Sequence, residues 1–65
     1  MPGIDRHKLI SLLASGRTDF RGVNFIPGVD LSGLNLTGLN FSRGQLSGAD
    51  CSHSIMDNTN LRGAS

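Results

Sequence analysis

An apolar residue returns at every fifth position between Thr18 and Ala64, with one interruption, and this period constrains the fold more than any other feature. A helix repeats every ~3.6 residues and a strand every ~2, so neither element keeps each fifth residue on one face. The chain therefore has to turn a corner once per five residues and coil. Such units bury their apolar sides against their neighbours, and about four of them would close one square turn.

The central residues of the units form the predicted core. We expect their side chains to point inward at Phe20, Phe25, Leu31, Leu36, Phe41, Leu46, Cys51, Met56 and Leu61. One extra residue near Pro27 and Gly28 breaks the spacing, and we expect it to be absorbed at a corner. Counting one turn along the coil places Phe20 on Phe41, which predicts an aromatic pair inside the core.

A polar residue stands directly before almost every centre and is the most specific part of the pattern. These residues are Asp19, Asn24, Asp30, Asn35, Asn40, Gln45, Asp50 and Asn60, with Ile55 as the exception. The pattern resembles that of the pentapeptide-repeat family, whose consensus is Ala-(Asp/Asn)-Leu-x-x, over about three quarters of the chain. The resemblance implies an all-β solenoid: a right-handed quadrilateral β-helix of about two and a third coils.

The residues before the repeats predict a short α-helix that caps the first coil. Asp5 is a suitable N-cap, the helix runs to about Ser15, and Gly16 follows as the C′ residue. Its leucines fall on one face, and so short an amphipathic helix needs a surface to cover.

The chain is therefore divided into residues 1–17, a lead-in and capping helix, and residues 18–65, the β-helix. The last unit begins at Ala64, and nothing in the sequence blunts the final coil. We expect this open end to continue in a longer chain or to pair end to end with another copy.

Composition narrows the function classes. A net charge of +1 gives no global electrostatic case for binding nucleic acid or an anionic membrane. A single cysteine makes no internal disulfide, and no apolar run is long enough for a signal peptide or a membrane span. We expect a bacterial cytoplasmic location, with signal-independent secretion left open.

Few residues suggest chemistry. Cys51 and His53 are close in sequence, but the repeat points Cys51 inward and His53 outward, which argues against a nucleophile and base pair. Asp30 and Asp50 share an outward column one coil apart and either bind a cation or bond locally to backbone and serine groups. We predict no catalytic, cofactor or metal site, and no enzyme.

Arginines gather on one side of the coil. Arg21 and Arg62 share a column two coils apart, Arg43 lies beside it, and Arg17 extends it. This strip is either a solvated basic face or a site for an acidic partner surface or phosphates. No exposed aromatic residue is available to stack on a base, so we expect no nucleic acid partner.

The prediction for function is a rigid repeat scaffold or protein–protein interaction module within a larger bacterial protein, with a protein as its partner. The resemblance also offers two alternatives. One is a DNA-mimicking inhibitor of gyrase of the quinolone-resistance type, which needs a strongly acidic surface that this chain lacks. The other is a non-catalytic module of a secreted bacterial effector.

Overall fold

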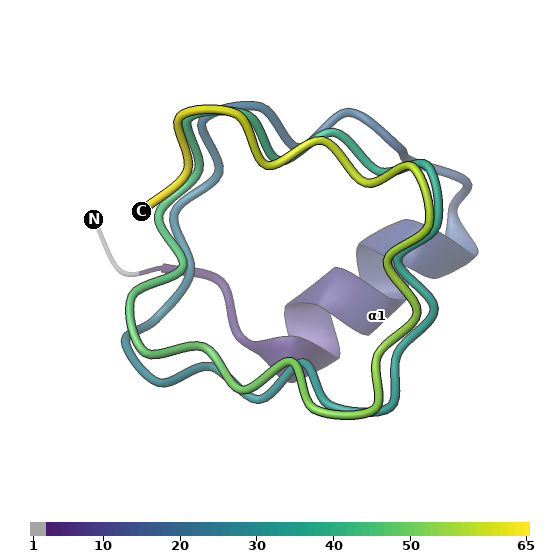
Figure 1. Ribbon diagram of the computed structural model, residues 1–65. Coiled ribbons are helices and arrows are strands. Elements are labelled where there is room, and N and C mark those ends of the chain that lie inside the picture. Colours follow the sequence, from purple (N-terminus) through teal and green to yellow (C-terminus); the bar gives the residue numbers. More distant parts are fainter. Residues whose placement is uncertain (1–2) are drawn as a thin grey trace.

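The chain winds into turns that overlie one another when viewed along the coil, with a squared outline (Figure 1). The computed structural model describes residues 3–65. Met1 and Pro2, which belong to the predicted lead-in, lie outside the described residues. No helix in the described part is long and apolar enough to cross a membrane.

Isolated parallel bridges join each turn to the next. The pairs are Asp19 with Asn40, Asn24 with Gln45, Asp30 with Asp50, Asn35 with Ile55, and Asn40 with Asn60. The offset is 21 residues where a pair spans the extra residue and 20 elsewhere. The paired positions directly precede the predicted centres, so the predicted stacking register is confirmed.

No continuous strand or sheet forms within residues 3–65, where the β structure consists of single bridges. A turn follows each centre, so few residues on each side are free to pair before the chain bends again. The structure thus supports the coarser prediction, a coil of stacked turns, and does not show the sheets that an all-β solenoid would have.

Tight turns form the corners. The carbonyl of Phe20 accepts a hydrogen bond from the amide of Val23 at 3.1 Å, and Gly22 between them has a φ of 67°. A positive φ at this third position is the requirement of a type II turn. After Phe25 the turn starts one residue late, at Ile26, so the extra residue sits directly before the predicted Pro27–Gly28 corner.

The helix α1 (Arg6–Ala14) follows the lead-in. Asp5 is its N-cap and accepts a hydrogen bond from the amide of Lys8 at 2.8 Å, as predicted. Ser15 is the C-cap, and Gly16 follows with a φ of 89°. The helix lies across one end of the coil (Figure 1).

The lead-in itself extends the stack. Ile4 forms a parallel bridge with Phe25, and its amide donates to the carbonyl of Asn24 at 2.8 Å. Gly3 lies so close to this turn that an added Cβ would collide with the backbone of Phe25 and Ile26. Chain pairing therefore begins before the predicted start of the repeats, and it brings α1 directly onto the first turn.

The core lies inside the first two turns and under α1. Its buried members are Leu9, Phe20, Phe25, Val29, Leu31, Leu36, Leu39 and Phe41. The Phe41 ring centroid lies 5.4 Å from that of Phe20 and 5.8 Å from that of Phe25, so an aromatic cluster fills the centre. Five of the predicted centres are therefore among these buried residues.

The other predicted centres need correction. Leu46, Cys51 and Met56 are only partly buried against this core, and Leu61 is 44% exposed. They belong to the last turns, and within residues 3–65 no further turn covers them. The repeat thus fixes the position of each centre within a turn, whereas burial depends on a neighbour at each side.

Candidate functional site

The polar residue before each centre has a structural task. The Asn35 side-chain oxygen accepts hydrogen bonds from the amide of Thr37 at 3.1 Å and from its hydroxyl at 2.6 Å. Asp30 and Asp50 accept the same pair of bonds from Ser32 and Ser52. This bond to a backbone amide two residues ahead is an Asx turn, and it stabilises the corner.

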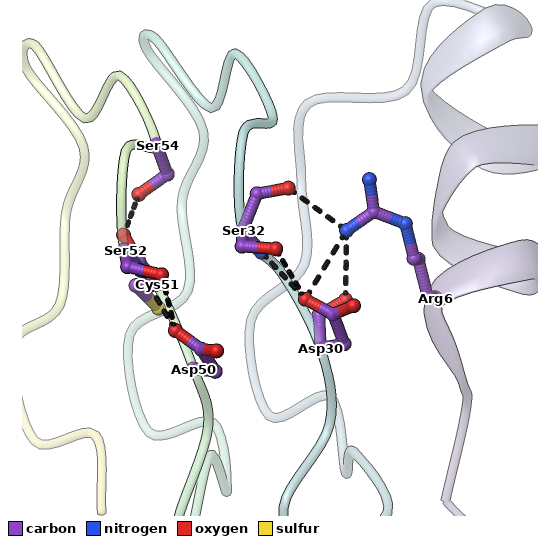
Figure 2. Close-up of polar contacts among 7 residues, drawn as sticks. All are labelled: Arg6, Asp30, Ser32, Asp50, Cys51, Ser52 and Ser54. Atoms are coloured by element: carbon purple, nitrogen blue, oxygen red, sulfur yellow. Dashed lines mark hydrogen bonds and ion pairs between the residues drawn. The ribbon is translucent and has the colours of Figure 1, made fainter.

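Asp30 and Asp50 point outward from adjacent turns, as Figure 2 shows. Arg6 from α1 reaches the first of them: its Nη1 donates to the carbonyl oxygens of Ser32 at 2.9 Å and Asp30 at 3.2 Å, and lies 3.4 Å from Asp30 Oδ1. This side chain therefore fastens the helix to the coil. Sequence reasoning missed it, because no local pattern relates residues 24 and 26 positions apart.

The pKa values of these carboxyl groups reflect the same bonds. The hydroxyl and amide of Ser32 lower the pKa of Asp30, with a smaller contribution from Arg6. Those of Ser52 lower the pKa of Asp50, against the repulsion from Asp30. Local bonding is thus the alternative that the structure supports for this column. No group of three potential ligands from His, Cys, Asp and Glu gathers in residues 3–65.

The predicted separation of Cys51 from His53 is visible at the next corner. Cys51 is partly buried, and desolvation raises the pKa of its thiol. His53 is exposed and occupies a turn position with a φ of 58°. The arrangement therefore lowers the thiolate population of Cys51 rather than raising it, and a nucleophile would need the opposite.

The most distinctive surface feature is a groove of about 860 Å³ that crosses three successive turns. We call it the arginine groove. It is lined by Arg17, Asp19, Arg21, Gly22, Ser42, Arg43, Asn60, Arg62 and Gly63. The structure thus brings the predicted strip together with Arg17, so four of the five arginines in the chain share one groove with one carboxylate.

Two of these arginines already have partners. Arg21 makes a two-pronged contact with Asp19, from Nε to Oδ1 and from Nη2 to Oδ2, each at 2.9 Å. Hydrogen bonds from Arg21 lower the pKa of Asp19, which stays ionised at neutral pH. Arg17 donates from Nε to the Asp19 carbonyl at 2.8 Å and lies over the Phe20 ring, 4.8 Å from its centroid.

The adjoining turns are held in register by their backbones. The amide of Gly22 donates to the carbonyl of Ser42 at 2.9 Å, and the amide of Arg43 donates to that of Arg62 at 2.9 Å. An added Cβ on Gly63 would lie 3.5 Å from Cγ of Arg43, so the Arg43 stem crosses this glycine. The backbone of the groove is therefore fixed by hydrogen bonds between the turns, and the arginine side chains extend from this fixed backbone.

The comparison with protein families agrees with the repeat pattern. Residues 45–65 match the family model described as Pentapeptide repeats (8 copies). No curated protein and no solved structure matches the chain. The matched segment and the earlier turns share one bridge register and one corner geometry. The last part of the chain, residues 45–65, is therefore similar to pentapeptide repeats, and the earlier turns have the same geometry.

Proposed function

We propose that the chain is a rigid scaffold that binds a protein partner through the arginine groove, as part of a larger bacterial protein in the cytoplasm. The underlying fold is proposed to be the right-handed quadrilateral β-helix of the pentapeptide-repeat family. The observation that carries the functional proposal is the gathering of Arg17, Arg21, Arg43 and Arg62 in one groove that holds a single carboxylate, that of Asp19.

Charge placement favours a partner with an acidic surface. The whole chain carries +1, yet this groove combines four arginines with one aspartate, so the positive charge is concentrated on one side. Clustered charge of one sign speeds association with an opposite surface and selects against similar ones. The DNA-mimic alternative is not carried forward, since it needs an acidic face where this chain has a basic one.

Rigidity supports the scaffold role. Backbone hydrogen bonds join successive turns at 2.7–3.1 Å, for example between the Leu36 amide and the Ile55 carbonyl at 2.7 Å. A surface held in this way loses little conformational entropy when a partner binds. The arginine side chains still have to be ordered, and part of the binding free energy is spent on them.

The test compares an acidic peptide with a neutral one. We expect a peptide of glutamates to bind the wild-type chain, a glutamine peptide of the same length not to bind, and added salt to weaken the complex. Changing Arg21, Arg43 and Arg62 together to serine should weaken glutamate-peptide binding by at least ~10-fold in isothermal titration calorimetry.

Lys8→Ser is the control, because it removes one positive charge from an exposed residue of α1 outside the groove. It should leave the affinity nearly unchanged. Equal binding by the wild type and the triple variant would remove the arginine groove from the proposed function.

A further inference from the structure

The arginine groove contains two guanidinium groups that no other residue in the described part of the chain engages. Among residues 3–65, the side chains of Arg43 and Arg62 have no hydrogen-bond or ion-pair partner, in contrast to Arg21 and Arg17. Asp19, the acid in the groove, is already engaged by Arg21 through both carboxylate oxygens. The groove therefore offers two adjacent cations without a counter-charge of their own.

Three successive turns carry an arginine each, and the position of the arginine within the corner alternates from one turn to the next. At the first corner position the turns carry Arg21, Ser42 and Arg62, and at the second they carry Gly22, Arg43 and Gly63. Each arginine therefore has a small residue in the same column on the adjacent turn. Turns joined by β-type hydrogen bonds lie ~4.8 Å apart, so this alternation brings guanidiniums into one groove without stacking them directly on each other.

Arg43 occupies its position against a backbone preference. Its φ is 61°, in the left-handed region where the equivalent residues on both neighbouring turns, Gly22 and Gly63, are glycine. The two other exceptions on the coil are His53 and Asn58, which are residue types that enter this region more readily. Residues held in unfavourable backbone conformations cluster at functional sites, so an arginine at this corner supports a role for its side chain.

The hydroxyl of Ser42 is also free for a ligand. At the corresponding positions the hydroxyls of Ser32, Thr37 and Ser52 donate to the preceding Asx side chain at 2.6–2.7 Å. Within residues 3–65, the Ser42 hydroxyl makes no such bond, and only its amide donates to Asn40. The groove thus offers a neutral donor beside the guanidiniums.

We propose that the arginine groove recognises a phosphomonoester dianion on a side chain of the protein partner, with Arg43, Arg62 and Ser42 as its ligands. This inference rests on the proposed function and narrows it to a phosphorylated partner. A carboxylate carries one charge, whereas a phosphomonoester carries about −1.5 to −2 at neutral pH and three acceptor oxygens. Two guanidiniums and a hydroxyl match that charge and that number of acceptors.

The rest of the groove favours a protein as the source of the phosphate. All three phenylalanines are buried in the core, so no exposed aromatic ring is present to stack on the base of a nucleotide. No large apolar residue lines the groove to enter a lipid surface. Its volume of about 860 Å³ leaves room for residues that flank the phosphate.

The experiment uses three peptides that differ only at the central residue of Ac-Gly-Gly-X-Gly-Gly-NH₂, where X is phosphoserine, glutamate or serine. Isothermal titration calorimetry at pH 7.5 should show the phosphoserine peptide binding at least ~10-fold more tightly than the glutamate peptide. Inorganic phosphate should bind more weakly than the phosphoserine peptide, and so should phosphatidylcholine vesicles that contain phosphatidic acid.

Two single variants locate the site. Arg43→Gly and Arg62→Ser should each lower the affinity for the phosphoserine peptide by ~10-fold, and the control Lys8→Ser should not. Arg43→Gly also tests the cost of the left-handed backbone, because it places the residue of the neighbouring turns at this position. It should raise the thermal unfolding midpoint, so its loss of binding would not reflect misfolding.

The pH dependence gives an independent readout. The phosphoserine affinity should fall between pH 7.5 and 5.0, because the second phosphate pKa is about 6. The charged groups that face the ligand are the four arginines and Asp19, and hydrogen bonds from Arg21 lower the pKa of Asp19, so this carboxylate stays ionised over the interval. Binding of the glutamate peptide should stay constant from pH 7.5 to 5.5.

Equal affinity for the phosphoserine and glutamate peptides would overturn the phosphate proposal and leave the acidic-partner scaffold standing. Tighter binding of inorganic phosphate or of the vesicles than of the phosphoserine peptide would overturn the assignment to a protein partner. An absence of binding to all these probes, together with no binding of the glutamate-rich peptide, would remove both proposals.

Discussion

The side of the coil that α1 covers and the open side formed by the last turns follow one sequence pattern, but they differ in how deeply their apolar side chains are buried. Leu36 and Phe41 are fully buried, whereas Leu61, at the position equivalent to Phe41 one turn later, is 44% exposed. The apolar residues of the last turns line a hollow of about 380 Å³ on the open side. A pentad therefore specifies where a side chain points, and a neighbouring turn or helix decides whether it is buried.

The largest effect is expected from a truncation of the aromatic cluster. Phe41→Ala should lower the free energy of unfolding by about 3–5 kcal/mol, because it removes a buried ring that contacts Phe20 and Phe25 and leaves a cavity. The matched change on the open side, Leu61→Ala, should cost less than about 1 kcal/mol, since the side chain is already half in water.

Urea unfolding followed by circular dichroism measures both variants. Should Phe41→Ala unfold the chain completely, Leu36→Val offers a milder loss on the same side, of about 1 kcal/mol. Equal losses for Phe41→Ala and Leu61→Ala would show that the two sides are packed alike and would contradict the comparison.

The sequence predicted what is periodic. The five-residue repeat placed the centres, the stacking of Phe20 on Phe41 and the bridge register, because each depends only on counting along the chain. Asp5 and Gly16 marked the helix ends through local capping rules. The groove was also foreseen as a strip, because Arg21, Arg43 and Arg62 follow the same count.

The rest depends on contacts that no period encodes. Two of them cross the boundary between the helix and the repeats. Ile4 forms a bridge with Phe25, 21 positions away, and Arg6 donates a hydrogen bond to Asp30, 24 positions away. Likewise, the graded burial from Phe41 to Leu61 reflects neighbours outside each pentad. The pairing of Arg21 with Asp19, which leaves Arg43 and Arg62 without a partner among residues 3–65, depends on rotamers that the pattern does not specify.

A smaller effect is expected where the helix is fastened to the capped side. Arg6→Met keeps most of the aliphatic stem and removes the donors to the Asp30 and Ser32 carbonyls. We expect a loss of about 1 kcal/mol, because the two carbonyls regain water and the Arg6 ion pair with Asp30 is partly exposed. Amide hydrogen exchange should rise first in α1 and at Ile4.

The control for this variant is Lys8→Met, which removes a positive charge from an exposed residue of the same helix whose side chain makes no hydrogen bond or ion pair within residues 3–65. Its exchange rates should match those of the wild type. Faster exchange spread evenly over all turns in Arg6→Met would mean that the helix and the coil open as one unit, and the two sides would then not differ in local stability.

The smallest effect separates the two aspartates of one column. Hydrogen bonds from Ser52 lower the folded-state pKa of Asp50, so its contribution to stability is full above the unfolded pKa of about 3.9 and is lost as the pH falls through the lower folded value. Asp50→Asn should keep the Asx turn, as Asn35 does with Thr37, and should relieve the repulsion from Asp30. Stability at pH 7 should therefore barely change, while the decline between pH 4 and pH 2 becomes shallower in thermal melts.

Asp30→Asn should show the same shallower decline and also lose the Arg6 ion pair on the capped side. If the acid slopes of both variants matched the wild type, the Asx carboxylates would not be the groups that set the acid stability.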